Sequence, residues 1–208
     1  MKKSIIATLV SLAFASTAFA AAPAMDLAAG QAQLGYSRDN LQTNANGLDL
    51  GAYQANNYQL AYGLSNKLAL TGSYLGSGSK NFNVNIPGVY NGALNDVSFN
   101  STTLGLQYKL SDNIAVSAGS LKSEIQANGT STPSTETFGG IAYKQNITKN
   151  MAGYASYLKS TNVTDWKTGL TYKLGSDTSL DAGYHSYQNN GTNDLTAKGV
   201  GFGVNHKF

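Results

Sequence analysis

The chain has 208 residues, a formal net charge of +3 and only 12% charged residues, which argues against a nucleic-acid-binding or polybasic membrane surface. It has no cysteine, so disulfides and cysteine-based metal sites are excluded. Its 23 glycines and 13 tyrosines, combined with few charges, are typical of strands and turns rather than of a helical bundle.

The first twenty residues have the pattern of an export signal. Lys2 and Lys3 precede a short apolar run over 4–15, and Ala18, Phe19 and Ala20 match a cleavage site. The run is too short to cross a bilayer as a helix, and no other window holds some twenty consecutive apolar residues. We therefore predict a signal peptide over 1–20 and a single domain over 21–208.

Beyond residue 20, alternating strands and tight polar turns recur. One unit begins at Tyr62, Tyr108 and Tyr172, with a looser version over 143–152, and each version places a tight polar turn of Ser, Asn, Asp or Gly between two strands. In chain order we predict ten strands near 27–37, 57–64, 68–75, 100–110, 114–121, 137–146, 151–159, 165–174, 179–187 and 196–208. Such close spacing leaves no room for crossover helices, so neighbouring strands should be antiparallel. Eight strands are the alternative if the first two are absent.

The four tight turns alternate with longer polar segments near 38–56, 76–99, 122–136, 160–164 and 188–195. Short turns at one end and long loops at the other are typical of outer-membrane barrels. The first long segment contains Asn40, Asn44, Asn46, Asn56 and Asn57. Such loops either contact other molecules or are only solvated.

Most predicted strands have one apolar face and one small or polar face. The apolar face, expected to contact lipid, carries Leu34, Tyr36, Tyr58, Leu60, Tyr62, Leu64, Leu68, Leu70, Tyr74, Leu104, Leu106, Tyr108, Leu110, Ile114, Val116, Trp166, Leu170, Tyr172, Leu174, Leu180 and Tyr184. The lumen face carries Gln31, Gln33, Gln59, Thr71, Ser73, Thr103, Gln107, Ser117, Thr171 and Asn205. Gly199, Gly201 and Gly203 on this face are expected to leave space for water. Two strands are ambiguous. In 137–146, Phe138 falls on the face that is expected to line the lumen, and in 151–159 both faces carry apolar residues.

Aromatic residues near the strand ends are expected to form two membrane-interface belts. The turn-side belt contains Tyr62, Tyr108, Tyr143, Tyr172 and Phe208, and the opposite belt contains Tyr36, Tyr74 and Trp166. A soluble β-barrel or sandwich that buries these rings in its core is the alternative.

The turn phrase over 108–119 and the ending over 203–208, with His206 and Phe208, resemble Gram-negative outer-membrane porins. The resemblance implies an all-β, closed, antiparallel up-and-down transmembrane barrel with short periplasmic turns and long extracellular loops. It also implies outer-membrane lipid as the surroundings and the barrel assembly machinery, which reads the C-terminal strand, as a partner. General porins have about sixteen strands and an arginine-lined constriction. This chain has a single arginine, Arg38, so that constriction cannot be built here.

Four lysines are expected to line one mouth of the lumen. Lys109, Lys144, Lys173 and Lys207 each adjoin a belt aromatic, so their side chains should point inward, with Lys167 further up the same lumen. A ring of cations favours anions. The alternative is that these lysines only solvate the rim. Gln59 and Gln107 are further pore-lining candidates.

Catalysis and cofactors are not expected. Asp181, His185 and Tyr187 share the lumen parity and suggest a hydrogen-bond network, whereas His206 is on the lipid face. The second acidic pair of ten-strand outer-membrane proteases is missing, and two histidines on opposite faces form no metal site. We expect an outer-membrane barrel giving small hydrophilic solutes a narrow passive path; a non-conducting structural or adhesive surface barrel is the alternative.

Overall fold

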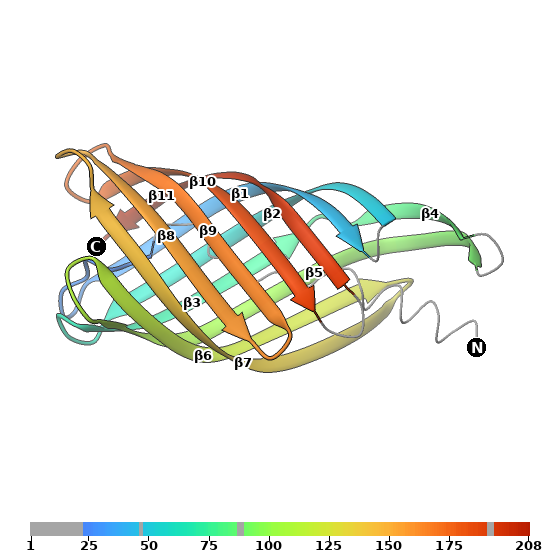
Figure 1. Cartoon of the computed structure of the whole chain (residues 1–208), viewed down its shortest axis with the longest axis horizontal. Helices are drawn as coiled ribbons and strands as arrows, with labels where there is room; N and C mark the ends of the chain where they lie inside the picture. The colour runs from blue at the N-terminus through green and yellow to red at the C-terminus, as the bar shows by residue number, and fades with distance from the viewer. Residues whose placement is uncertain (1–22, 46–47, 87–89, 191–193) are drawn as a thin grey trace.

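The computed structural model describes residues 23–45, 48–86, 90–190 and 194–208 (Figure 1). The predicted signal peptide over 1–20 and Asn46 lie outside the described residues. Within the described ranges, no helix combines the length and apolar composition needed to cross a membrane.

The structure describes eleven strands. They are β1 (Ala32–Ala45), β2 (Leu48–Gly63), β3 (Leu68–Ser77), β4 (Lys80–Ile86), β5 (Tyr90–Lys109), β6 (Ile114–Ala127), β7 (Thr130–Asn146), β8 (Met151–Ser160), β9 (Val163–Lys173), β10 (Thr178–Asn190) and β11 (Asp194–Lys207).

Ten of these strands close into an antiparallel barrel (Figure 1). The order is β3-β2-β1-β11-β10-β9-β8-β7-β6-β5, and β3 pairs with β5 to complete the ring. The short β4 lies outside this ring and pairs with the beginning of β5. The prediction of ten antiparallel barrel strands is therefore confirmed, and the eight-strand alternative is excluded. Closure pairs both edges of each wall strand, which a barrel in lipid requires.

The four predicted tight turns share one geometry. In each, a backbone N–H donates to the carbonyl four residues later: Leu64 to Leu68, Leu110 to Ile114, Ile147 to Met151 and Leu174 to Thr178, at 2.8–2.9 Å. In three of them the hydroxyl of Ser65, Ser111 or Thr148 also accepts a backbone N–H across the turn. The small polar residues thus satisfy backbone groups that the turn leaves unpaired.

At the end of the barrel opposite the tight turns, the prediction of long loops is wrong. Most of 38–56, 76–99, 122–136 and 188–195 continues the strands as long hairpins, and only residues 161 and 162 separate β8 from β9. Their asparagines and glycines lower strand propensity, but cross-strand pairing compensates. Tyr36 Oη donates to Asn56 Oδ1 at 2.9 Å, and Arg38 donates to Gln54. Loops predicted from local composition alone therefore end the strands too early.

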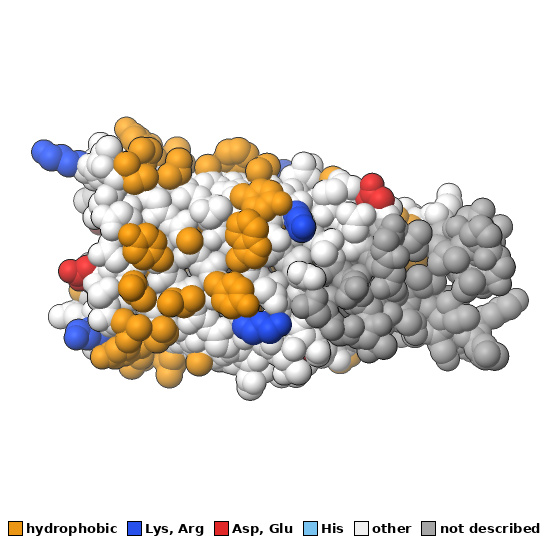
Figure 2. Space-filling view, viewed as in Figure 1, with side chains coloured by type: hydrophobic (Ala, Val, Ile, Leu, Met, Phe, Trp, Pro, Cys, Tyr) orange, Lys and Arg blue, Asp and Glu red, His pale blue; other side chains and the backbone are white. Residues whose placement is uncertain are grey.

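The outer wall carries an apolar belt next to the tight turns (Figure 2). Its side chains are the predicted lipid-facing residues, which are exposed except for Leu68, Ile114 and Val116, which are intermediate. On β1 the outward face changes from Leu34 and Tyr36 to the polar Arg38 and beyond. Since a membrane-spanning strand needs only about 9–11 residues, the 20-residue β5 extends well past this belt. The alternative of a soluble barrel that buries its aromatics does not fit this surface.

The two ambiguous strands are resolved by packing inside the barrel. Phe138 on β7 and Leu158 on β8 point inward and form a buried cluster with Leu121 on β6. Tyr154 also points inward, whereas Tyr157 is 45% exposed on the outer wall. The lumen is therefore not lined by polar residues alone.

Candidate functional site

Five ionisable side chains from β1, β9 and β10 gather on the inner wall, where β11 lies between β1 and β10. This charged cluster consists of Asp39, Asp165, Lys167, Asp181 and His185, and each side chain is at most 3% exposed. Alternation along the strands places them inside, since Asp165 and Lys167 flank the outward Trp166. The charges are withdrawn from bulk solvent, so each depends on its neighbours for stabilisation.

The cluster is connected by hydrogen bonds between strands. His185 Nε2 lies 2.7 Å from Asp165 Oδ1, and Tyr154 Oη donates to Asp181 Oδ1 at 2.9 Å. Asp181, His185 and Tyr187 are lumenal, as predicted, but the bonds found for Asp181 and His185 go to Tyr154 and Asp165 on neighbouring strands. The network therefore joins β8 to β10 and β9 to β10.

By formal charge, the charged cluster is acidic. Three carboxyl groups face one ammonium, which gives a formal charge of −2 with every carboxyl ionised and His185 neutral. Lys167 lies within electrostatic range of Asp39, Asp165 and Asp181. This part of the lumen is opposite in sign to the lysines at the mouth.

Inward glycines make room for this cluster and do not leave empty space. Gly169, Gly183 and Gly201 lie opposite one another on β9, β10 and β11. A Cβ on Gly169 or Gly183 would lie 2.5 Å from Tyr154 Oη, and one on Gly201 would overlap Asp39. A Cβ on Gly203 would likewise approach the Tyr36 carbonyl oxygen to 2.7 Å. The expectation that Gly199, Gly201 and Gly203 provide water space is thus wrong, because neighbouring strands and side chains occupy that volume.

Three residues of the charged cluster and its hydrogen bonds were not identified from the sequence. Asp39 was assigned to a loop, although it lies in β1. The inward direction of Tyr154 could not be predicted, because both faces of β8 carry apolar residues. Asp165 could have been found, since it lies two residues before Lys167 and therefore shares its face.

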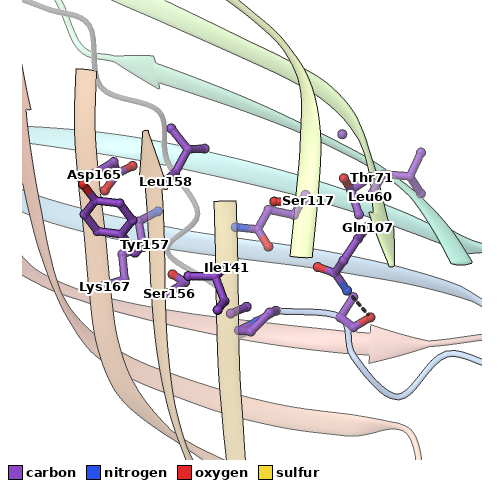
Figure 3. Close-up of a pocket in the computed structure, with 15 residues that line it drawn as sticks. Leu60, Thr71, Gln107, Ser117, Ile141, Ser156, Tyr157, Leu158, Asp165 and Lys167 are labelled. Atoms are coloured by element: carbon purple, nitrogen blue, oxygen red, sulfur yellow. Dashed lines mark hydrogen bonds between the residues drawn. The ribbon is translucent and has the colours of Figure 1, made fainter. Parts of the chain in front are cut away.

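A cavity of about 60 Å³, lined by apolar as well as polar residues, lies in the barrel interior between facing walls (Figure 3). Gln59, Gln107 and Ser117 line one side, and Asp165 and Lys167 line the other. The predicted lumen residues Gln59 and Gln107 are therefore correctly placed, and Lys167 belongs to the deep interior. Gln31 is an exception, because it precedes β1, is exposed, and accepts the Ala28 N–H through its side chain at 2.9 Å.

The turn-side mouth contains a second cavity of about 230 Å³. Lys144, Lys173 and Lys207 line it, and Lys109 lies close enough to interact electrostatically with Asp26 at the same mouth. We call these four residues the lysine ring. Lys109 Nζ is also 2.9 Å from the exposed carboxylate of Asp112, as the alternative of lysines solvated at the rim would have it. Three of the four predicted lysines line this cavity, whereas Lys109 lies within electrostatic range of Asp26; their role in lining a pore and their effect on anions stay predictions.

Residues 23–27 enter this mouth, and β1 begins at Ala32, so the strand predicted over 27–37 starts later than expected. Asp26 Oδ2 lies 2.8 Å from Lys144 Nζ. Burial alone would raise the pKa of Asp26, but the nearby ammonium groups, chiefly that of Lys144, lower this pKa below its usual value. Asp26 is therefore an anion at neutral pH, and the pairing stabilises the segment until the pH falls through that lowered pKa.

The predicted belt aromatics are all exposed on the outer wall. The rings of Tyr36, Tyr58 and Tyr74 follow one another across β1, β2 and β3, with centroids 5.4 and 6.5 Å apart. Trp166 pairs with Tyr184 at 5.5 Å in the same manner. The turn-side belt residues Tyr62, Tyr108, Tyr143, Tyr172 and Phe208 are 43–67% exposed. His206 lies on the outer wall too, packed edge-on against Phe208 at 4.6 Å. The position of these rings at lipid headgroups stays a prediction.

Among the described residues, no group of three or more His, Asp or Glu side chains has a geometry that could hold a metal ion. The charged cluster contains a histidine–carboxylate pair, but both partners are enclosed by the inner wall. A catalytic role would need substrate access to that pair.

No family model matches this sequence, and no curated protein matches it. Similar solved structures include Ail, the attachment invasion locus protein of Yersinia pestis, at 14% identity and a TM-score of 0.42, covering 86% of this chain and 99% of that one. Neisserial surface protein A has 16% identity and a TM-score of 0.45, with 86% and 99% covered. The translocator domain of the autotransporter NalP from Neisseria meningitidis has 10% identity and a TM-score of 0.45, with 99% and 95% covered. At these values the likeness concerns the barrel fold alone, so function has to be argued from the residues of this chain.

Proposed function

We propose that this protein is a non-enzymatic outer-membrane barrel that gives small hydrophilic solutes a narrow passive path. The observation that carries the proposal is the interior cavity, where Gln107 and Ser117 on one wall and Asp165 and Lys167 on the other place polar groups among apolar ones. Polar groups on both walls offer a solute hydrogen bonds in place of its water shell. The larger cavity at the lysine ring supplies an entrance.

The path is narrow because large side chains occupy part of the lumen. Phe138, Leu121 and Leu158 pack together inside the barrel, and Tyr154 lies over the inward glycines. Barrels of about eight strands are filled by side chains, whereas open porins have about sixteen. A ten-strand barrel with these contents suits ions and very small solutes.

Selectivity should be set at the mouth, where the lysine ring is positive. We expect single channels of refolded protein in planar bilayers to show small, steady conductance with mild anion preference in a salt gradient. Replacing Lys144, Lys173 and Lys207 together by glutamine should shift the reversal potential to a value that indicates more cation selectivity, because the deeper charged cluster is formally negative. Lys149→Gln, in a turn outside the ring, is the control. Cation preference that the triple replacement leaves unchanged would contradict the role of the ring.

A second candidate function is a non-conducting structural or adhesive surface barrel. The observation that favours it is the long polar hairpins, which continue β1, β2 and β5 beyond the apolar belt. A barrel that is folded in the same bilayers but silent would support this candidate against the pore.

The location and assembly of the barrel belong to the same proposal. The apolar belt supports placement in the outer membrane of a Gram-negative bacterium, with the tight turns in the periplasm. The porin-like strand β11 is then the segment through which barrel assembly machinery would recognise the chain.

A further inference from the structure

Residues 23–27 occupy the turn-side mouth of the barrel, although they belong to none of its strands. Met25 is 3% exposed and Leu27 is 7% exposed, so both side chains are enclosed. Pro23 and Ala24 line the inner cavity, and Pro23 and Asp26 line the cavity at the lysine ring. This segment therefore stands between the entrance and the interior.

Polar contacts from three wall strands hold the segment in place. Asp26 Oδ2 is 2.8 Å from Lys144 Nζ on β7, and Lys207 Nζ on β11 donates to the Asp26 carbonyl oxygen at 3.0 Å. Gln107 Nε2 on β5 donates to the Ala24 carbonyl oxygen at 3.1 Å, the bond drawn in Figure 3. Both Asp26 contacts involve the lysine ring, so they depend on charge.

The following residues attach the segment to the wall by its backbone. Gly30 N–H donates to the Gly63 carbonyl at 2.8 Å, and Gly63 N–H donates to the Gln31 carbonyl at 2.9 Å. Gly30 has φ +83°, a left-handed conformation that suits glycine and turns the chain from β1 into the mouth. The attachment at 28–31 uses backbone bonds, whereas 23–27 is held by side chains of the wall and by burial. The boundary between the two parts lies between Leu27 and Ala28.

We propose that residues 23–27 form a releasable plug of the turn-side mouth, held by the Asp26 carboxylate within the lysine ring. The carboxylate occupies the place that a passing anion would take. Small anions at high concentration compete for the same ammonium groups and weaken the plug. The consequence for solute flux rests on the proposed pore function, but the contact itself does not.

The plug can be tested without reference to conductance, because the chain has no native cysteine. Met25→Cys in refolded protein is probed with a water-soluble maleimide. We expect slow labelling that Asp26→Lys accelerates roughly tenfold, since the carboxylate contact is lost and like charges are brought together. Lys144→Asp should also accelerate labelling, and the charge-exchanged pair Asp26→Lys with Lys144→Asp should restore protection. Lys149→Asp, outside the ring, is the matched control.

The outcomes separate the plug from the pore. Rapid labelling of Met25→Cys in the otherwise unchanged chain, or a rate that neither Asp26→Lys nor Lys144→Asp changes, overturns the plug. Accelerated labelling that the charge exchange reverses supports it, even if every variant is electrically silent, in which case only the pore fails. Conductance that rises with labelling supports both.

Discussion

Replacing Lys167 with methionine is expected to lower the free energy of unfolding by about 3–5 kcal/mol, the usual cost of removing one partner from a buried charged group. Lys167 is the only ammonium in the charged cluster, where it faces Asp39, Asp165 and Asp181 at 2% exposure. Without it, three carboxyl groups remain enclosed with no ammonium among them. Urea unfolding of the barrel in lipid vesicles, followed by tryptophan fluorescence, measures the change.

The control for Lys167→Met is Lys173→Met on the same strand. Lys173 is exposed at the mouth, so its replacement should change the free energy of unfolding by less than about 0.5 kcal/mol. Equal effects of the two substitutions, or a loss below about 1 kcal/mol for Lys167→Met, would show that the charges in the cluster are not mutually stabilised.

Gly199→Ala is expected to have the second large effect, a loss of about 3 kcal/mol, at the upper end of the range for overpacked interiors. Gly199 lies in β11 between Leu41 of β1 and His185 of β10. A Cβ there would overlap the backbone carbonyl oxygen of Asn40, which cannot rotate away as a side chain would. The β1–β11 pairing that closes the barrel should therefore weaken.

The matched control for this change is Gly139→Ala on β7. A Cβ at Gly139 has no neighbour within 4 Å, so the same added methyl group should be tolerated. Folded and unfolded forms are compared by their gel mobility with and without heating. If both variants fold equally well, the close approach of β11 to β1 at Gly199 is not a requirement of closure.

Sequence reasoning succeeded where the chemistry is local. The four tight turns were predictable because Ser65, Ser111 and Thr148 satisfy nearby backbone groups. The outer wall was predictable because strand side chains alternate with a period of two, so Leu104 and Leu106 identify one face regardless of the partner strands.

Features that depend on distant partners were not predictable in this way. The polar hairpins are strands because residues such as Asn56 bond across to Tyr36, which composition does not reveal. Tyr154 points inward because Gly169 and Gly183 leave space for it on other strands. The position of Asp26 depends on the lysine ring, whose members come from four different parts of the chain.

The most direct test of the account is a nitroxide scan of β5 in lipid vesicles, using single cysteines in this cysteine-free chain. Spin labels at Leu104 and Leu106, which are 60% and 48% exposed, should collide with oxygen dissolved in the bilayer. Labels at Thr103 and Gln107, on the lumen side, should be protected from oxygen. The account predicts this alternation along the strand. Oxygen accessibility that is reversed between the two pairs, or equal at all four positions, would contradict an outer wall that faces hydrocarbon.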